Sequence, residues 1–325
     1  MAIPTNTSTT YSAIGIRESL ANVIYNIAPL DTPFFSGCSK QSVDNTFFEW
    51  QTDTISAGAA NRHLEGDGQD STSADARENP VRVGNYTQIS RYIIQTSGTN
   101  EAVDYAGRKS SQAYQLAKKA KRMKRDIEFM LTSNVARNAG ATGTERVSAG
   151  LPAWIATNYH SLGSGAATGT ASSGNGTDTA TDATTDNSIT EAGIKTVIKE
   201  AYESGGDPDM IMCKPDIKQA ISDLTQSVSS LRTAADKVAP AHVVAAVDVY
   251  VSDFGTFRIV PNRNQARSQD VFILDMDHWA MGVLRDFKTV DLAVTGDSQR
   301  QMLLYEAGLM SKNEKSSGYL ANVTA

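Results

Sequence analysis

The most metal-like cluster in the chain is Asp275-Met-Asp277-His278, which follows directly on the apolar run 271–274. Carboxylates and imidazoles are common metal ligands, and a hydrolase would need Asp275, Asp277 and His278 to converge with a further ligand. A polar cluster at the end of a strand is more typical of a turn that caps the next element. We therefore expect a capped turn here and no metal site.

A second set of acids, Asp178, Asp182 and Asp186, is evenly spaced in the segment 160–187. The dense ligand spacing of an EF-hand is missing, and so are its Gly and Glu positions. Gly, Ser, Thr and Ala dominate the segment, so it has too little apolar surface to offset the entropy cost of ordering. We expect a flexible, exposed insertion with solvated aspartates.

Catalytic motifs are missing from the sequence, which contains no G-x-S-x-G, C-x-x-C or H-E-x-x-H. Gly107-Arg-Lys-Ser110 superficially resembles a phosphate-binding loop, but it lacks the first Gly and the Gly before Lys. The four histidines are far apart: His63, His160, His242 and His278. The sequence predicts a protein that is not an enzyme and that needs no cofactor.

Composition points to an ordinary globular protein of 325 residues with 40% hydrophobic residues and a formal charge of −6. The acidic balance argues mildly against nucleic-acid binding as the main task. No apolar run reaches the ~18 residues of a membrane span, and the N-terminus lacks the pattern of a secretion signal. Two lone cysteines, Cys38 and Cys213, agree with a reducing compartment. We expect folding in a cytoplasm and no contact with a membrane.

The sequence predicts one long charged helix, from Glu101 to about Asn138, around which the other predicted elements are arranged. Its small apolar residues recur in steps of three and four, which places them on one narrow face. These residues are Val103, Ala106, Ser110, Ala113, Ala117, Ala120, Ile127 and Leu131. At about 1.5 Å per residue the helix would be on the order of 57 Å long. We interpret it as a spine that other elements cross.

Basic residues crowd the middle of this helix, and Lys118, Lys121, Arg122 and Arg125 share a face. No aromatic residue is interleaved with them, as a nucleic-acid interface would favour. A solvated face or salt bridges between subunits are the alternatives. We favour pairing with a partner chain, and weak non-specific contact with packaged DNA is the second interpretation.

Before the spine, the chain contains an apolar arm and a predicted hairpin. The arm has Ile14, Leu20, Val23, Ile24 and Ile27 at helical spacing, and then prolines at 29 and 33 before Phe34-Phe35. Strand-like runs at 46–55 and 81–96 flank a polar stretch and predict a long two-stranded hairpin that leads directly into the spine. Such a hairpin is only marginally stable alone in water, so we expect support from another chain. For the arm, docking on a partner and folding back on its own body remain equally open.

A compact α/β unit follows the spine. Ser188-x-x-Glu191 predicts a capped helix, the run 209–213 a buried strand, and Pro215 the start of a second helix. Further strands are expected at 247–251, 257–261, 271–274 and 279–284. A two-stranded ribbon with a turn at Gly296-Asp297 then leads to a polar tail from Ser311.

This order of parts resembles the major capsid protein fold of tailed double-stranded DNA phages. The stretches that carry the resemblance are Ala28-Pro-Leu-Asp-Thr-Pro-Phe-Phe35, Val251-Ser-Asp-Phe-Gly-Thr-Phe-Arg-Ile-Val-Pro-Asn262 and Gly296-Asp-Ser to Lys312-Asn-Glu. The resemblance implies an α+β fold with five parts. These are an N-terminal arm (1–44), an extended hairpin loop (45–98), a spine helix in a peripheral domain (99–147), an axial domain (148–284, with the insertion 160–187), and returning peripheral strands with a C-terminal tail (285–325).

The resemblance also implies a function. The chain would be a shell subunit that forms pentamers and hexamers of an icosahedral head enclosing double-stranded DNA, assembled in the host bacterial cytoplasm. Scaffolding, portal and decoration proteins are implied partners. An encapsulin-like bacterial compartment shell is the alternative. The residues expected at contacts between subunits are Phe34, Phe35, Phe47, Trp50, Tyr86, Tyr92, Lys118, Lys121, Arg122 and Arg125.

In some members of this family a lysine of the extended loop bonds covalently to an asparagine of a neighbour. This sequence has no lysine between Lys40 and Lys109. We therefore expect a shell held together by non-covalent contacts.

Overall fold

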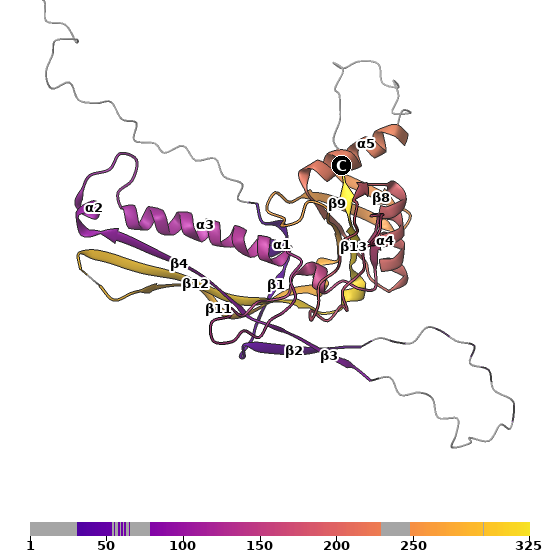
Figure 1. Cartoon of the computed structure of the whole chain (residues 1–325), viewed down its shortest axis with the longest axis horizontal. Helices are drawn as coiled ribbons and strands as arrows, with labels where there is room; N and C mark the ends of the chain where they lie inside the picture. The colour runs from indigo at the N-terminus through magenta and orange to yellow at the C-terminus, as the bar shows by residue number, and fades with distance from the viewer. Residues whose placement is uncertain are drawn as a thin grey trace, which may run out of the picture.

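The computed structural model describes residues 31–53, 79–228, 248–294 and 296–325, together with positions 55, 58, 60, 62 and 65. The predicted helix within 1–30, most of the hairpin tip and the polar stretch around 229–247 lie outside the described residues. Within the described residues the chain forms a compact α/β body and a slender limb (Figure 1). No helix among the described residues is long and apolar enough to cross a membrane.

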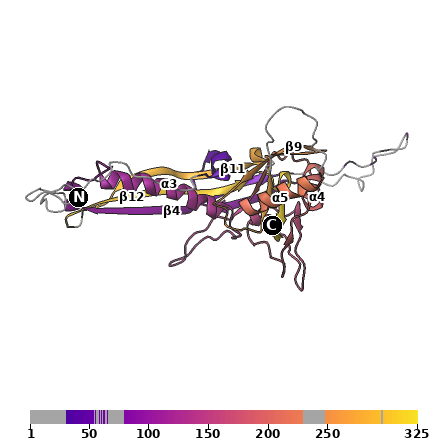
Figure 2. The same ribbon diagram turned by 90° about the horizontal axis from the view of Figure 1, so that it is seen from above.

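The slender limb is a four-stranded sheet with one long helix on it. The strand order is β1 (Ser39–Ser42), β11 (Trp279–Asp291), β12 (Ser298–Ser311) and β4 (Gln88–Ser97). β1 runs parallel to β11, whereas β11–β12 and β12–β4 are antiparallel. Helix α3 (Ser111–Leu131) lies along this sheet. Figure 2 shows the same limb edge-on as a narrow layer.

The predicted spine is shorter than expected. Helix α3 has 21 residues, or about 31 Å, and begins where the Ser110 side chain accepts a hydrogen bond from the N–H of Ala113. The preceding chain forms the short helix α2 (Gly98–Ala102) and a turn at Gly107, whose φ is +75°. A helix cannot pass through such a left-handed backbone position, which glycine adopts readily.

The predicted stripe of α3 is confirmed at Ile127 and Leu131 but not at its small residues. Met123, Ile127 and Leu131 are buried, whereas Ala113 and Ala117 are exposed. The small residues matched helical spacing over part of the sequence, but the larger side chains gain more by burial and set the orientation. The helix therefore packs through the face of its larger residues.

The compact body is a six-stranded sheet with two helices. The strand order is β5 (Tyr159–Ser161), β13 (Gly318–Ala321), β10 (Val271–Leu274), β7 (Met210–Cys213), β9 (Gly255–Pro261) and β8 (Val249–Ser252). Helices α4 (Glu191–Glu203) and α5 (Pro215–Val228) complete it.

The predicted strands at 209–213, 257–261 and 271–274 and the start of α5 at Pro215 are confirmed. The cap of α4 is Thr190, which accepts from the N–H of Gly193, and not Ser188, because Ser188 lies in β6 (Asn187–Ser188).

The predicted hairpin is only half correct. Strands β2 (Phe47–Thr52) and β3 (Val81–Tyr86) pair with each other as a two-stranded sheet. The second half of the expected strand, β4, instead pairs with β12 over ten residue pairs. The backbone passes from one sheet to the other at Thr87, which is buried. Local strand propensity does not show such a change of partner.

The C-terminal segment was expected to be a polar tail, and this is wrong. The ribbon β11–β12 is confirmed, but the chain then returns through a short 3-10 helix (Glu314–Ser316) into β13, which lies between β10 and β5. β14 (Val323–Thr324) pairs with β6. Tyr319 and Leu320 are completely buried, so the last residues are part of the core.

Candidate functional site

The metal-like cluster is a capped turn, as expected. Asp275 caps a short 3-10 helix (Met276–His278) by accepting from the N–H of Asp277 at 3.2 Å, and its Oδ2 lies 2.8 Å from Nδ1 of His278. Among the described residues no three His, Cys, Asp or Glu side chains gather in a way that could hold a metal ion. Cys38 and Cys213 are buried free thiols, and burial raises the pKa of Cys213 to about 12.

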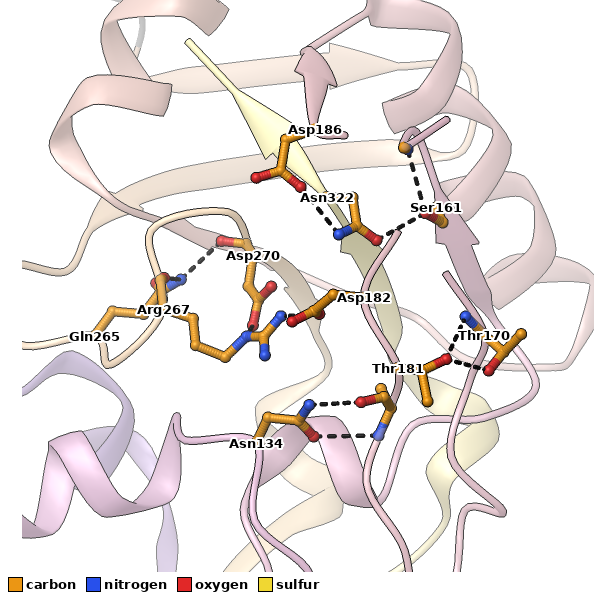
Figure 3. Close-up of polar contacts among 12 residues, drawn as sticks. Asn134, Ser161, Thr170, Thr181, Asp182, Asp186, Gln265, Arg267, Asp270 and Asn322 are labelled. Atoms are coloured by element: carbon orange, nitrogen blue, oxygen red, sulfur yellow. Dashed lines mark hydrogen bonds and ion pairs between the residues drawn. The ribbon is translucent and has the colours of Figure 1, made fainter. Parts of the chain in front are cut away.

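The segment 160–187 is largely exposed, as expected of an insertion, but it forms a hydrogen-bonded ladder. Ser164 pairs with Thr185 and Thr170 with Thr181 through isolated bridges. Its far end folds back onto the compact body. There Ala180 is 4% exposed and exchanges two hydrogen bonds with the amide of Asn134 (Figure 3).

Asp178 and Asp182 are exposed, as expected of solvated acids, and Asp186 is half-buried, but each of the three also has a hydrogen-bond or ion-pair partner within the chain. Asp178 accepts from the N–H and the hydroxyl of Ser173, both at 2.8 Å. Asp182 pairs with Arg267, and Asp186 accepts from Nδ2 of Asn322 at 3.0 Å. The sequence could not show these contacts because two of the partners lie far away along the chain.

Arg267 lies between two carboxylates, as Figure 3 shows. Its guanidinium contacts Asp182 of the ladder and donates from Nε to Asp270 at 2.7 Å. The side chain of Asp270 is completely buried. Burial raises the pKa of Asp270 to about 6, although Arg267 acts in the opposite direction. This pair of contacts attaches the ladder to the body.

A buried carboxylate, Glu128, joins three parts of the molecule. It lies on α3 and is 0% exposed. It accepts from the N–H groups of Phe34 and Phe35 at 3.0 and 2.7 Å, and from Nδ2 of Asn262 at 2.6 Å. Burial raises the pKa of Glu128, while these donors oppose that rise. The N-terminal helix α1 (Pro33–Gly37), the spine and the turn after β9 thus meet at one side chain.

Sequence reasoning missed Glu128 because it stood among the charged residues of an apparently solvated helix. The usable signal was its position directly after Ile127 and within a turn of Leu131, on the side of the helix that carries the large apolar residues.

A second buried acid, Glu306, contacts Arg146 and Arg285. It lies on β12 beside the junction of β3 and β4, where Thr87 donates to it at 3.0 Å.

The aromatic residues expected at subunit contacts mostly pack within this chain. Phe34 and Phe35 are buried, with their rings against Trp279 and Tyr305 at centroid distances of 5.9 and 6.1 Å. Trp50 contacts Trp154 at 5.3 Å, and the half-buried rings Phe47 and Tyr86 contact each other at 4.6 Å across β2 and β3.

The cations of α3 differ in what they contact. Lys119 and Arg122 lie over the ring of Tyr92 from β4, at 4.9 and 5.4 Å from its centroid. No aromatic residue is interleaved with these cations in the sequence, but Tyr92, which is distant along the chain, lies beside them in the fold. Arg125 donates to Asn264 at 3.2 Å. Lys118 and Lys121 are exposed.

Comparison with known proteins places these features in a family. The family model described as SU10 major capsid protein matches residues 3–324. A curated relative, the major capsid protein of Escherichia phage Phieco32, is 29% identical over an alignment of 339 residues, and the match covers 95% of this chain and 95% of the relative.

Solved structures show the same fold at low sequence identity. The capsid protein of cyanophage A-1(L) is 11% identical with a TM-score of 0.70, and the match covers 99% of this chain and 100% of the other. The SrpI encapsulin of Synechococcus elongatus is 8% identical with a TM-score of 0.55 over 93% of each chain, so it is a weaker structural relative. The tailed-phage capsid fold expected from the sequence is thereby confirmed. The chain belongs to the SU10 major capsid protein family and is a structural subunit of a phage capsid.

Proposed function

We propose that this subunit forms the pentamers and hexamers of an icosahedral head that encloses double-stranded DNA, and that it assembles in the host bacterial cytoplasm without catalysing a reaction. The observation that supports this best is the apolar surface left on the slender parts of the fold. Val81 of β3, Ile93 of β4 and Phe129 of α3 are 61%, 52% and 56% exposed. Exposed apolar groups on narrow limbs are typical of surfaces that other subunits cover.

Within this proposal, the hairpin loop 45–98 contacts a neighbouring subunit through β2 and β3. Phe47, Trp50 and Tyr86 are half-buried there and keep surface for a partner. Phe34 and Phe35 no longer belong to the proposed interface, because their side chains are buried in this chain's own core. Tyr92 acts indirectly, since its ring supports the cations of α3.

The cationic face of α3 is the second proposed contact. Lys118, Lys121 and Arg122 are exposed, and Arg125 lies beside them. Acidic side chains of a neighbouring subunit are the proposed partners, and weak contact with packaged DNA is the alternative. Surface pairs of this kind contribute little singly and more in a network.

The division into arm (1–44), hairpin loop (45–98), spine region (99–147), axial domain (148–284) and returning segment (285–325) remains part of the proposal. Two features of the fold cross its last boundary. β11 runs from Trp279 to Asp291, and β13 joins the six-stranded sheet of the compact body. The returning segment therefore links both parts of the molecule.

Electron microscopy of particles tests the proposed function. The chain is expressed alone and together with candidate scaffolding, portal and DNA-packaging proteins, and the particles are examined for icosahedral symmetry and for nuclease-protected DNA. Icosahedral shells with protected DNA support a phage head. Closed shells that contain an enzyme in place of DNA would support the encapsulin alternative, and a persistent monomer would contradict both.

A charge reversal separates the two roles of the α3 cations. The variant K118E/K121E is compared with K195E/K199E, whose lysines are ion-paired with Glu191 and Glu203 on α4. If neighbouring subunits supply the partners, only the first variant loses particles. If DNA is the partner, shells form normally but protect less DNA.

A further inference from the structure

The end of the ladder carries a chemically reactive pair, Asn175-Gly176, which is the only Asn-Gly pair in the sequence. Glycine has no side chain to shield its backbone nitrogen, so this nitrogen can attack Cγ of the preceding asparagine. A bond then forms between the Gly176 nitrogen and Cγ, the Cγ–Nδ2 bond breaks, and ammonia leaves with the proton of the Gly176 N–H. Water opens the resulting succinimide ring and leaves aspartate or isoaspartate at position 175.

The Asn175 side chain is already polarised for this attack. Its Oδ1 accepts hydrogen bonds from the N–H of Thr177 at 2.9 Å and from the Thr177 hydroxyl. Attack at Cγ places negative charge on Oδ1, and donors that are bonded to this oxygen beforehand stabilise that charge. Asn175 is half-buried and Thr177 is exposed, so solvent reaches the site to open the ring.

The Gly176 nitrogen, in contrast, is protected by its docking on the body. Its N–H donates to the carbonyl of Ala153 at 3.1 Å, and the carbonyl of Gly176 accepts from the N–H of Arg137 at 2.7 Å. Gly176 is buried. The nitrogen must lose its proton before it attacks, and in the docked ladder that proton is held in the hydrogen bond to Ala153. Deamidation therefore requires local opening of the ladder end.

We propose that Asn175 is a modification site whose deamidation is controlled by the docking of the ladder end on the body. The docked ladder blocks the reaction, and the undocked ladder permits it. Isoaspartate adds one carbon to the backbone beside Gly176, so this residue can no longer bond to both Ala153 and Arg137. The reaction thus converts a reversible opening into a permanent one. This inference goes beyond the proposed function and does not depend on assembly.

A second contact of the ladder offers a way to weaken docking without changing the reacting residues. The side chain of Asn134 exchanges two hydrogen bonds with the backbone of Ala180, at 2.7 and 3.1 Å (Figure 3). Asn134→Ala removes both bonds. The matched control is Asn138→Ala in the same connection after α3. The exposed Asn138 side chain accepts from the N–H of Gly140, within its own turn, at 2.9 Å.

Peptide mapping by mass spectrometry tests the proposal on unassembled full-length chains incubated at mildly alkaline pH. The urea-unfolded chain gives the rate of deamidation at Asn175 without protection. The folded wild type should react at least about tenfold more slowly, which corresponds to about 1.4 kcal/mol of free energy for undocking. Asn134→Ala should react faster than wild type when folded and equally fast in urea, whereas Asn138→Ala should match wild type in both.

Two results would overturn the proposal. One is an equal rate in the folded and the unfolded wild type, because docking would then give no protection. The other is a folded Asn134→Ala chain that reacts no faster than Asn138→Ala.

Hydrogen exchange supplies a second readout that needs no weakening variant. Wild-type chain that has formed isoaspartate is separated by chromatography, and exchange over 172–181 is compared with exchange over the core strand β7. We expect faster exchange in the ladder end and unchanged exchange in β7. Asn175→Asp carries the new charge without the extra backbone carbon and should keep the protection of the ladder end.

Unchanged exchange over 172–181 in the isoaspartate chain would overturn the permanent release of the ladder. If Asn134→Ala also exposes β7, that variant has unfolded as a whole, and the two comparisons made on wild type decide the proposal. Particle formation enters none of these measurements, so their outcome is independent of the proposed function.

Discussion

Glu128 and Asn262 meet inside the protein, with Nδ2 of the amide donating to the carboxylate at 2.6 Å. The same carboxylate accepts from the N–H groups of Phe34 and Phe35. One residue of α3 therefore holds the start of the described chain and the turn after β9 in fixed positions. The apolar rings of Phe34 and Phe35 are buried at this joint as a consequence.

Glu128→Gln is expected to destabilise the unassembled chain at neutral pH. The glutamine side chain keeps one acceptor oxygen, but its NH2 group takes the place of the second carboxylate oxygen, which accepts a hydrogen bond in wild type. A buried donor without a partner lowers the free energy of unfolding by about 1–3 kcal/mol. The free energy of unfolding, measured in urea, gives the difference. Lys124→Gln on the exposed side of the same helix is the control and should change stability by less than about 0.5 kcal/mol. Equal stability of Glu128→Gln and wild type would contradict the role of the joint.

Asp270→Asn is expected to change how stability depends on pH. The folded pKa of Asp270 is about 6, above its ordinary value of 3.8. A carboxyl with a raised pKa contributes stability below its unfolded pKa, and this contribution is lost as pH rises through the folded value. The stability of wild type relative to Asp270→Asn should therefore fall between pH 4 and 7, by at most about 3 kcal/mol.

Urea unfolding of the two unassembled chains at several pH values measures this difference. Gly143→Ala, which changes no titratable group, serves as the control, and its difference from wild type should stay constant over this pH range. An increase in the relative stability of wild type with pH would mean that the attraction of Arg267 outweighs the burial of Asp270.

Gly176→Ala tests whether the end of the ladder packs against the body. Gly176 has a φ of +76°, and an added Cβ would lie 2.9 Å from the Trp154 ring. Gly143 has a φ of +88° with open space around it, so Gly143→Ala measures the backbone strain alone, about 1–2 kcal/mol. Gly176→Ala should cost a further ~1–3 kcal/mol from overpacking.

Thermal or urea unfolding of both alanine variants supplies the comparison. Equal losses of stability in the two variants would show that the ladder does not pack against the Trp154 ring. They would then restore the sequence-based expectation of a loose insertion.

Mature particles are expected to dissociate fully in denaturing gel electrophoresis. The hairpin loop contains no lysine, since none occurs between Lys40 and Lys109, so it has no amine for an isopeptide bond to an asparagine. Particles treated with an amine-reactive cross-linker are the positive control, in which ladders should appear. Covalent ladders in untreated particles would contradict a shell held by non-covalent contacts.

The sequence by itself determined the order of parts and the character of the most apolar elements. β7, β10 and the start of α5 at Pro215 were predictable, because short apolar runs and a proline at the first helical position act locally. The ribbon around Gly296 was predictable for the same reason. Together with the motif stretches, these features were enough to indicate a capsid subunit.

Only the tertiary structure decided which segments pair and which side chains are buried. β4 leaves the β2–β3 hairpin and pairs with β12, and the residues after Ser311 enter the core as β13. Pairing with a distant strand depends on long-range geometry, which residue spacing does not encode. The same reason applies to Asp182 and Glu128, which looked solvated in the sequence. Their partners Arg267 and Asn262 are distant in the chain, and the fold brings each pair together.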